Sequence, residues 1–406
     1  MTAPAQVTPP LAKRTQVLGT ENAFVVLAEV GALQAQGKDI LSFCIGQPDF
    51  PTPSNICEAA INAIRGGKHG YTPSAGIALL RQAVARETER THGFDVRPED
   101  VVIGAGAKPF IGYVIQCVTD YGAGDEVIFP VPGFPIYESQ VLSQGAVPVG
   151  LELRESRGFR MDAAALEAKI TPKTRLVILN TPQNPTGGVL TATDLHEIAE
   201  VLRKHPNVWV YADEVYSRLV YDGTFGSIAS QPGMKDRTIV TDGVSKAWAM
   251  TGWRLGWAVN RTLAPLLTRH VTNTESCASH ITQFAALEAL DGPQDHAETM
   301  RKTFAQRRDF IVRLLNQVPG VRCGNPGGAF YVWPNVTELC AKVGAADSEV
   351  LRKRLLHEAG IAVLSDVHFG PRVQEDGQHV RFSYAASKQD IAKGIGRMAE
   401  FVKAAG

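Results

Sequence analysis

Short apolar runs alternate with longer helical stretches between about residues 50 and 290. The run LVIL at 176–179 and the run VWVYA at 208–212 are apolar on both faces, which is typical of a sheet covered by helices on both sides. A longer segment at 193–204 has helical periodicity. This alternation predicts an α/β fold, with a mostly parallel sheet flanked by helices. The predicted strands are 101–103, 126–129, 147–153, 175–179, 208–212, 238–241 and 255–259.

The pattern changes after about residue 290, where short strands and helices mix without strict alternation. Helices are predicted at 298–317 and 348–358, and strands at 329–333, 361–364 and 379–383. This mixture of helices and short strands predicts a smaller α+β domain. We expect three parts: residues 1–48 as an N-terminal arm and small-domain segment, 49–290 as a large domain, and 291–406 as a small C-terminal domain. The first sixteen residues contain Pro4, Pro9 and Pro10 and are predicted to form a flexible arm.

Composition and charge exclude several classes of protein. The chain of 406 residues contains 41 basic and 41 acidic residues, so its formal net charge is zero. This balance does not favour binding to nucleic acid or to an anionic membrane, since both require clustered positive charge. No apolar run reaches about 18 residues, and the N-terminus lacks the pattern of a secretory signal. The six cysteines form no C-x-x-C pair, so we expect free thiols, no metal site and a cytosolic location.

Three motifs follow the ends of three predicted strands. They are NTPQNPTGG at 180–188, DEVY at 213–216, and the pair SK at 245–246 followed by GWRLG at 252–256. Each motif also has a purely structural interpretation: a turn, a helix cap and an ion pair. Ligands of parallel sheets bind at the carboxyl ends of the strands, where these motifs together place an amide, an acid, a phenol, an amine and a guanidinium.

One chemistry uses all of these groups. A lysine amine forms a Schiff base with a carbonyl cofactor, and a buried acid keeps the nitrogen of a pyridine ring protonated. An amide and a phenol hold the ring oxygen, and an arginine fork binds a phosphate through two hydrogen bonds. The motifs therefore predict a site for pyridoxal 5′-phosphate.

The sequence at this point resembles the fold-type I, class I and II aminotransferases, especially the branch similar to aspartate aminotransferase. The resemblance runs through SFCIGQPD (42–49), YTPSAG (71–76), the three motifs above, GGAFY (327–331) and VRFSY (380–384). Its most specific part is the pattern S-K-x₅-G-x-R-x-G, which begins at Ser245. It implies a large cofactor-binding domain, a small domain and a homodimer with shared active sites.

The resemblance implies a role for each matching residue at the reacting end of the cofactor. Lys246 would form the Schiff base and then carry the proton between the substrate and the cofactor as general base and acid. Asp213 would pair with the pyridine nitrogen. Asn184 and Tyr216 would hydrogen-bond the ring oxygen.

Further matches concern the phosphate. Arg254 and Ser245 would hold it. Gly106, Ala107 and Lys108 match the loop whose backbone amides receive the phosphate at a helix N-terminus.

The remaining matches concern the ring face, the substrate and a partner subunit. Phe134 matches the aromatic residue that stacks on the ring. Arg381 matches the arginine that binds the substrate α-carboxylate, and Gly46 and Asn184 are expected beside the same group. Tyr71 matches the tyrosine that crosses a dimer interface to the partner's phosphate.

Three points stay open at the level of sequence. Tyr137 suits either the site or core packing. Residues 272–280 (TNTESCASH) match a stretch whose hydroxyls contact the partner's phosphate, but Glu275 is an unexpected acid there. A dicarboxylate substrate needs a second cation, for which the candidates are Lys13, Arg14, Lys68 and His69.

The resemblance implies transamination between an L-amino acid, aspartate-like or of broad range, and a 2-oxo acid, in this family most often 2-oxoglutarate. The expected mechanism is ping-pong. A lyase, a decarboxylase or an oxidase with the same cofactor is the alternative. A non-catalytic ligand sensor is not expected, because the segment before residue 42 is too short to hold a DNA-binding domain.

Overall fold

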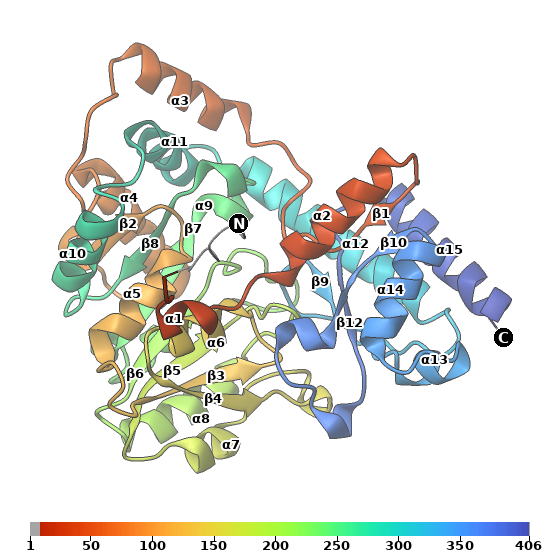
Figure 1. Ribbon diagram of the computed structural model, residues 1–406. Helices are drawn as coiled ribbons and strands as arrows, with labels where there is room; N and C mark the ends of the chain where they lie inside the picture. Colours follow the sequence, from red (N-terminus) through yellow and green to blue (C-terminus); the bar gives the residue numbers. More distant parts are fainter. Residues whose placement is uncertain (1–8, 406) are drawn as a thin grey trace, which may run out of the picture.

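A seven-stranded sheet forms the centre of the computed structural model, which describes residues 9–405 (Figure 1). The strand order is β2-β8-β7-β6-β5-β3-β4. Strand β8 runs antiparallel to its neighbours β2 and β7, and the other neighbouring strands are parallel. The predicted α/β class is confirmed, and all seven predicted strands are present. Their bounds are β2 (Val101–Gly104), β3 (Glu126–Val131), β4 (Val147–Glu152), β5 (Thr174–Asn180), β6 (Trp209–Asp213), β7 (Thr238–Gly243) and β8 (Gly256–Val259).

Alternate side chains of these strands enter two different cores. In β5, for example, Val177 packs in one core and Ile178 in the other, because successive side chains of a strand point to opposite faces. One core includes α3 (Ser54–Arg65), α4 (Ala78–His92), α7 (Ala163–Lys169), α8 (Ala192–Arg203) and α11 (His280–Asp291). The other includes α5 (Pro109–Val118), α6 (Ile136–Ser143) and α10 (Ala264–Thr274). Burial on both faces explains why the strand sequences are almost continuously apolar.

A smaller unit lies beside this sheet. It contains an antiparallel sheet in the order β11-β12-β9 and a parallel pair, β1-β10, in which Leu41 lies opposite Ile361. The N-terminal segment therefore packs against C-terminal elements, as Figure 1 shows for α2 and β1 in red. The division at residues 48 and 290 stays a prediction. The elements are α2 (Asn22–Ala35), β1 (Leu41–Ser42), α12 (Asp295–Leu315), β9 (Tyr331–Val332), α13 (Thr337–Lys342), α14 (Ser348–Glu358), β10 (Ile361–Ala362), β11 (Leu364–Ser365), β12 (Val380–Ser383) and α15 (Lys388–Ala405).

Two predicted elements differ in detail. The strand predicted at 361–364 is two short strands, because β10 pairs with β1 while β11 pairs with β12. Residues 1–8 of the predicted N-terminal arm lie outside the described residues. Within the rest of the arm, Lys13–Gln16 forms the short helix α1, and the Arg14 guanidinium lies 5.2 Å from the ring centroid of Tyr121.

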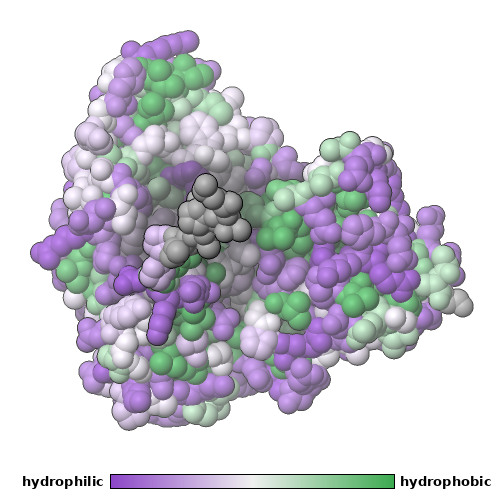
Figure 2. Space-filling view, viewed as in Figure 1, coloured by the Kyte–Doolittle hydropathy of each residue, from purple (hydrophilic) through white to green (hydrophobic). Residues whose placement is uncertain are grey.

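The surface and the cysteines add little that identifies a partner. In Figure 2 a green patch overlies α2, whose exposed apolar side chains are Phe24, Val25 and Leu27. No helix within residues 9–405 has the length and apolar character needed to cross a bilayer. All six cysteines are free thiols. Across the described residues, no cluster of three or more His, Cys, Asp or Glu side chains is arranged to hold a metal ion.

Candidate active site

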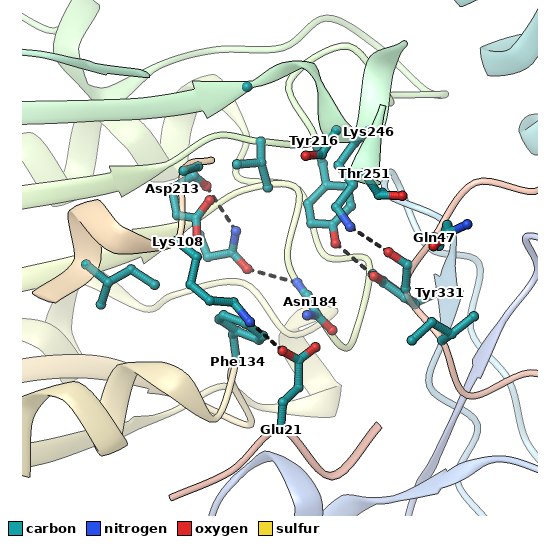
Figure 3. Close-up of a pocket in the computed structure, with 18 of the residues that line it drawn as sticks. Glu21, Gln47, Lys108, Phe134, Asn184, Asp213, Tyr216, Lys246, Thr251 and Tyr331 are labelled. Carbon is teal, nitrogen blue, oxygen red and sulfur yellow. Dashed lines mark hydrogen bonds and ion pairs between the residues drawn. The ribbon is translucent and has the colours of Figure 1, made fainter. Parts of the chain in front are cut away.

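One cavity of about 460 Å³ collects most of the predicted site residues. It lies at the carboxyl ends of β5, β6 and β7, where the three motifs begin, and the N-terminal segment closes one side (Figure 3). Gly106 lies just behind the lining, against Arg254, while Tyr71 is 88% exposed and does not line the cavity of its own chain. The predicted residues that line it are Gly46, Ala107, Lys108, Phe134, Asn184, Asp213, Tyr216, Ser245, Lys246, Arg254 and Arg381.

Lys246 is a half-buried residue whose amine lies in the cavity. It belongs to α9 (Val244–Ala247), which directly follows β7. Its Nζ donates a hydrogen bond of 2.5 Å to the backbone carbonyl of Gly46 and lies 5.7 Å from the ring centroids of both Tyr216 and Phe330. Burial lowers the pKa of Lys246 to about 8. At pH 7.5 roughly a quarter of the amine is therefore unprotonated, which is the form that attacks a carbonyl.

Asp213 presents one free carboxylate oxygen to the cavity. It is the last residue of β6, and its Oδ2 accepts a hydrogen bond of 2.6 Å from the hydroxyl of Tyr137. Its Oδ1 is buried without a hydrogen-bond partner. Burial raises the pKa of Asp213 to about 6, and the hydrogen bond from Tyr137 acts in the opposite direction by lowering this pKa. A buried acceptor without a partner is costly, so this oxygen is suited to a cationic N–H donor brought by a ligand.

Tyr216 and Tyr331 form the wall beside Lys246. Their hydroxyls are 2.8 Å apart, and the two rings pack edge to face with centroids 5.8 Å apart. Gly46 lies directly against this pair: a Cβ at residue 46 would be 2.3 Å from the Tyr331 hydroxyl. The absence of a side chain at Gly46 therefore allows the N-terminal segment to approach the amine of Lys246.

Arg381 lies deep in the cavity, although it is a charged residue. Its Nη1 donates to Asn184 Oδ1 over 2.9 Å, and its Nη2 donates to the carbonyl of Cys44 over 2.5 Å. The guanidinium carbon is 4.4 Å from the ring centroid of Tyr331. Its Nε has no hydrogen-bond partner. Arg381 and Asn184 are therefore brought together as predicted, with hydrogen-bonding capacity left for an anion.

The third part of the site is a cationic cradle around Gly106. Gly106 has a φ of +98°, and a Cβ there would be 2.4 Å from Nη2 of Arg254. Arg254 also has a positive φ, of +53°, and its Nη1 donates to the carbonyl of Thr251 over 2.9 Å. The helix α5 begins at Pro109, directly after Lys108, so its N-terminus lies beside Gly106 and Ala107. A phosphate group could be bound here by the guanidinium of Arg254, the N-terminus of α5 and the hydroxyl of Ser245.

Glu275 supports this cradle. Its Oε2 accepts from the backbone N–H of Ala105 over 2.7 Å, and its Oε1 accepts from the Tyr113 hydroxyl over 2.8 Å. The unexpected acid of the 272–280 stretch thus holds the residue before Gly106 in place. The hydroxyl of Thr274 is 2.6 Å from the hydroxyl of Tyr113.

Some residues of the site were not predicted. Tyr137, left open between packing and site, contacts Asp213, and Asn180 donates to the backbone carbonyl of Asp213 over 3.0 Å. Tyr331 lay inside a quoted motif but had no assigned role. Glu21 lines the cavity, and no sequence pattern marks it, since it lies between the predicted arm and the first motif.

The four candidate cations for a distal carboxylate do not line the cavity of this chain, and their role stays a prediction. Lys13 and Arg14 belong to the exposed helix α1. The Lys68 amine lies 5.4 Å from the ring centroid of Phe284, and the Nε2 of His69 is 2.9 Å from the carbonyl of Ile64. The cation in the outer part of the cavity is instead Lys108.

The residues present fit pyridoxal 5′-phosphate. The unpartnered Oδ1 of Asp213 matches a protonated ring nitrogen, the amine of Lys246 matches an aldehyde, and the cradle at Gly106 and Arg254 matches a phosphate. These three groups line or border a single cavity of suitable size.

Comparison with known proteins agrees with this chemistry. Residues 38–398 match the family described as Aminotransferase class I and II. The aspartate aminotransferase of Bacillus sp. (strain YM-2) is 37% identical over 97% of this chain and 99% of its own. The aspartate/prephenate aminotransferase of Cereibacter sphaeroides is 38% identical, covering 91% of this chain and 92% of its own.

A solved structure extends the similarity to the fold. The crystal structure of the aspartate aminotransferase from Rhizobium meliloti has a TM-score of 0.91 and 34% identity to this chain. The match covers 98% of this chain and 99% of that one. The sequence match, the fold and the residues of the cavity lead to one conclusion: the chain belongs to the class I and II aminotransferase family and is an aminotransferase.

Proposed function

We propose that this aminotransferase moves the amino group of an L-amino acid to 2-oxoglutarate by a ping-pong mechanism, with pyridoxal 5′-phosphate as its cofactor. The observation that carries the proposal is the meeting of the Lys246 amine and the unpaired Asp213 Oδ1 in one cavity. The relatives that match over nearly the whole chain are named aminotransferases, so a lyase, a decarboxylase or an oxidase is not favoured.

The cofactor supplies an aldehyde for amine exchange and a protonated ring that accepts electron density from the substrate Cα. Lys246 would hold the cofactor covalently, and its amine, once freed, would act as the base and acid that moves the substrate Cα proton. The low pKa of Lys246, set by burial, keeps part of this amine unprotonated near neutral pH. Asp213, which accepts a hydrogen bond from Tyr137, would keep the ring nitrogen protonated.

The remaining residues orient the reactants. Arg254, the Ser245 hydroxyl and the N-terminus of α5 anchor the phosphate and so set the position of the ring. Arg381 would bind the α-carboxylate of the amino acid, and Asn184, which accepts a hydrogen bond from Arg381, would hydrogen-bond the ring oxygen. Because both half-reactions use the same α-carboxylate site, the donor must leave before the acceptor binds, which is the basis of a ping-pong mechanism.

The central test is the variant Lys246→Ala. Wild-type protein mixed with pyridoxal 5′-phosphate and reduced with borohydride is expected to carry the cofactor mass on Lys246. The variant is expected to carry none and to show no turnover. Lys342→Ala, at an exposed position of α13, is the control and should behave as wild type. Covalent loading or turnover in Lys246→Ala would contradict the mechanism.

A steady-state experiment tests the reaction type. Varying an amino donor at several concentrations of 2-oxoglutarate should yield parallel double-reciprocal lines. Ammonia release without any 2-oxo acid would point instead to a lyase or an oxidase. Intersecting lines would exclude the ping-pong order.

We also propose a homodimer with shared active sites. Tyr71 is 88% exposed, and α2 exposes Phe24 and Val25, so both segments have apolar surface available to a second copy. Light scattering after size exclusion should yield a mass of about twice the 43.8 kDa of the chain. Tyr71→Phe should weaken cofactor binding in the dimer. A monomer that binds the cofactor with full affinity would contradict this proposal.

A further inference from the structure

Glu21 and Lys108 form an ion pair in the outer part of the cavity. Glu21 is the residue before α2, and Lys108 is the residue before α5. Lys108 Nζ and Glu21 Oε2 are 2.6 Å apart, and both side chains line the cavity (Figure 3). The side chains keep 43% and 23% of their surface exposed, Lys108 and Glu21 respectively, so each retains hydrogen-bonding capacity toward a ligand.

The pair lies close to the proposed reacting groups. Lys108 Nζ is 5.2 Å from the ring centroid of Phe134, the residue expected to stack on the cofactor. Burial lowers the pKa of Lys246, and the negative charge of Glu21 is the largest influence acting in the opposite direction. Lys108 acts on the same amine and lowers its pKa, so both members of the pair lie within electrostatic reach of the reacting group.

The charges that line the cavity in the described chain leave no uncompensated cation for a second carboxylate. Under the proposed function Lys246 carries the cofactor, Arg254 holds the phosphate and Arg381 holds the α-carboxylate. Lys108 is the other lining cation, and Glu21 neutralises it. A distal carboxylate that approached Lys108 would also approach the carboxylate of Glu21, and this repulsion offsets the attraction.

A carboxamide matches the pair without breaking it. The ammonium of Lys108 has three donors, of which one is used on Glu21, and the Oε1 of Glu21 is available as an acceptor. An amide group places an acceptor and a donor side by side, so its oxygen can accept from Lys108 while its nitrogen donates to Glu21. A carboxylate has no donor to offer to Glu21.

We propose that Glu21 and Lys108 read the substrate side chain and favour amino donors with a carboxamide, of the asparagine or glutamine type, over dicarboxylic ones. This inference rests on the proposed function, since it needs the α-carboxylate at Arg381 and the amine at Lys246. Glu21 would act as the specificity-determining residue, because it turns the lining cation Lys108 into half of a neutral pair.

Binding of two unreactive ligands tests the inference without turnover. Succinamate and succinate both carry one carboxylate for Arg381, and they differ only in a distal carboxamide or carboxylate. Titration calorimetry on the cofactor-loaded protein is expected to show succinamate binding at least tenfold more tightly than succinate. Glu21→Gln should strengthen succinate binding about tenfold and so remove the preference.

Two further variants complete the design. Glu338→Gln removes the same charge from an exposed position of α13 and should leave both affinities unchanged. Lys108→Met should weaken succinamate binding, because the amide oxygen loses its donor. A half-reaction screen should show asparagine or glutamine converting the cofactor faster than aspartate or glutamate.

The outcomes separate this inference from the proposed function. Borohydride trapping on Lys246 is measured first for every protein. Wild-type protein that does not load would overturn both. Protein that loads but binds succinate at least as tightly as succinamate would overturn the inference alone, as would a preference that Glu21→Gln leaves unmoved. If the Glu21→Gln protein does not load the cofactor, the inference is tested by two other measurements. They are the ratio of succinamate to succinate affinity in wild type and the succinamate affinity of Lys108→Met.

Discussion

Asp213→Asn is predicted to stabilise the cofactor-free protein while it abolishes function. The Asp213 carboxylate is buried, one of its oxygens has no partner, and burial raises its pKa from 3.8 to about 6. Asparagine keeps an oxygen that accepts from Tyr137 and removes the charge. The folded protein without cofactor then no longer carries a buried carboxylate above pH 6.

The size of the gain follows from the pKa of Asp213 in the two states. Between pH 3.8 and about 6 the folded state binds more protons than the unfolded state, so folding stability falls as pH rises through this window. The full penalty, reached above pH 6, is about 3 kcal/mol, since each pKa unit corresponds to about 1.4 kcal/mol. At pH 4.5 the same calculation leaves about 1 kcal/mol.

The assay is thermal unfolding of cofactor-free protein at pH 8 and at pH 4.5. With about 2.1 cal/mol/K of unfolding entropy per residue over 406 residues, 3 kcal/mol corresponds to a Tm increase of about 3 to 4 °C at pH 8. The increase should shrink to about 1 °C at pH 4.5. Added pyridoxal 5′-phosphate should raise the Tm of wild type much more than that of the variant. Glu338→Gln is the charge-matched control.

Two results would refute the reasoning about Asp213. A variant with a lower Tm than wild type at pH 8 would mean that the carboxylate stabilises the empty site. A gain of equal size at both pH values would mean that the charge of Asp213 is not its cause.

Three further predictions concern neighbouring groups. Gly106→Ala places a Cβ 2.4 Å from Arg254 Nη2, at a residue whose φ is +98°. The affinity for the cofactor, measured by fluorescence titration, should therefore fall at least tenfold. An undiminished affinity would argue against the phosphate cradle. Because the pKa of Lys246 is about 8, the rate of covalent loading should rise about tenfold per pH unit below pH 8 and level off above it, and a plateau only near pH 10 would contradict this. Tyr137→Phe removes the hydrogen bond to the Asp213 carboxylate, which is worth about 1.5 to 3 kcal/mol. The pKa of Asp213 should therefore rise by about 1 to 2 units, and the pH below which the cofactor no longer binds should rise by the same amount. A pH profile of binding identical to that of wild type would rule out this role of Tyr137.

The strands and the position of the site were predictable because their signals are local. A strand buried on both faces needs consecutive apolar residues, and the runs that end at Leu179 and Ala212 showed this directly. Parallel strands then bring their carboxyl ends to one edge, so Asn184, Asp213 and Lys246 had to meet there. The family resemblance assigned their roles.

The contacts within the site were not predictable, because they join residues that lie far apart in the chain. The sequence by itself determined the α/β class, the strands and the set of chemical groups at the sheet edge. Only the tertiary structure decided that Tyr137 binds Asp213, that Glu275 supports the backbone of Ala105, and that Glu21 neutralises Lys108. The reason is physical: strand periodicity depends on neighbours in sequence, whereas the partner of a buried charge depends on how whole segments pack.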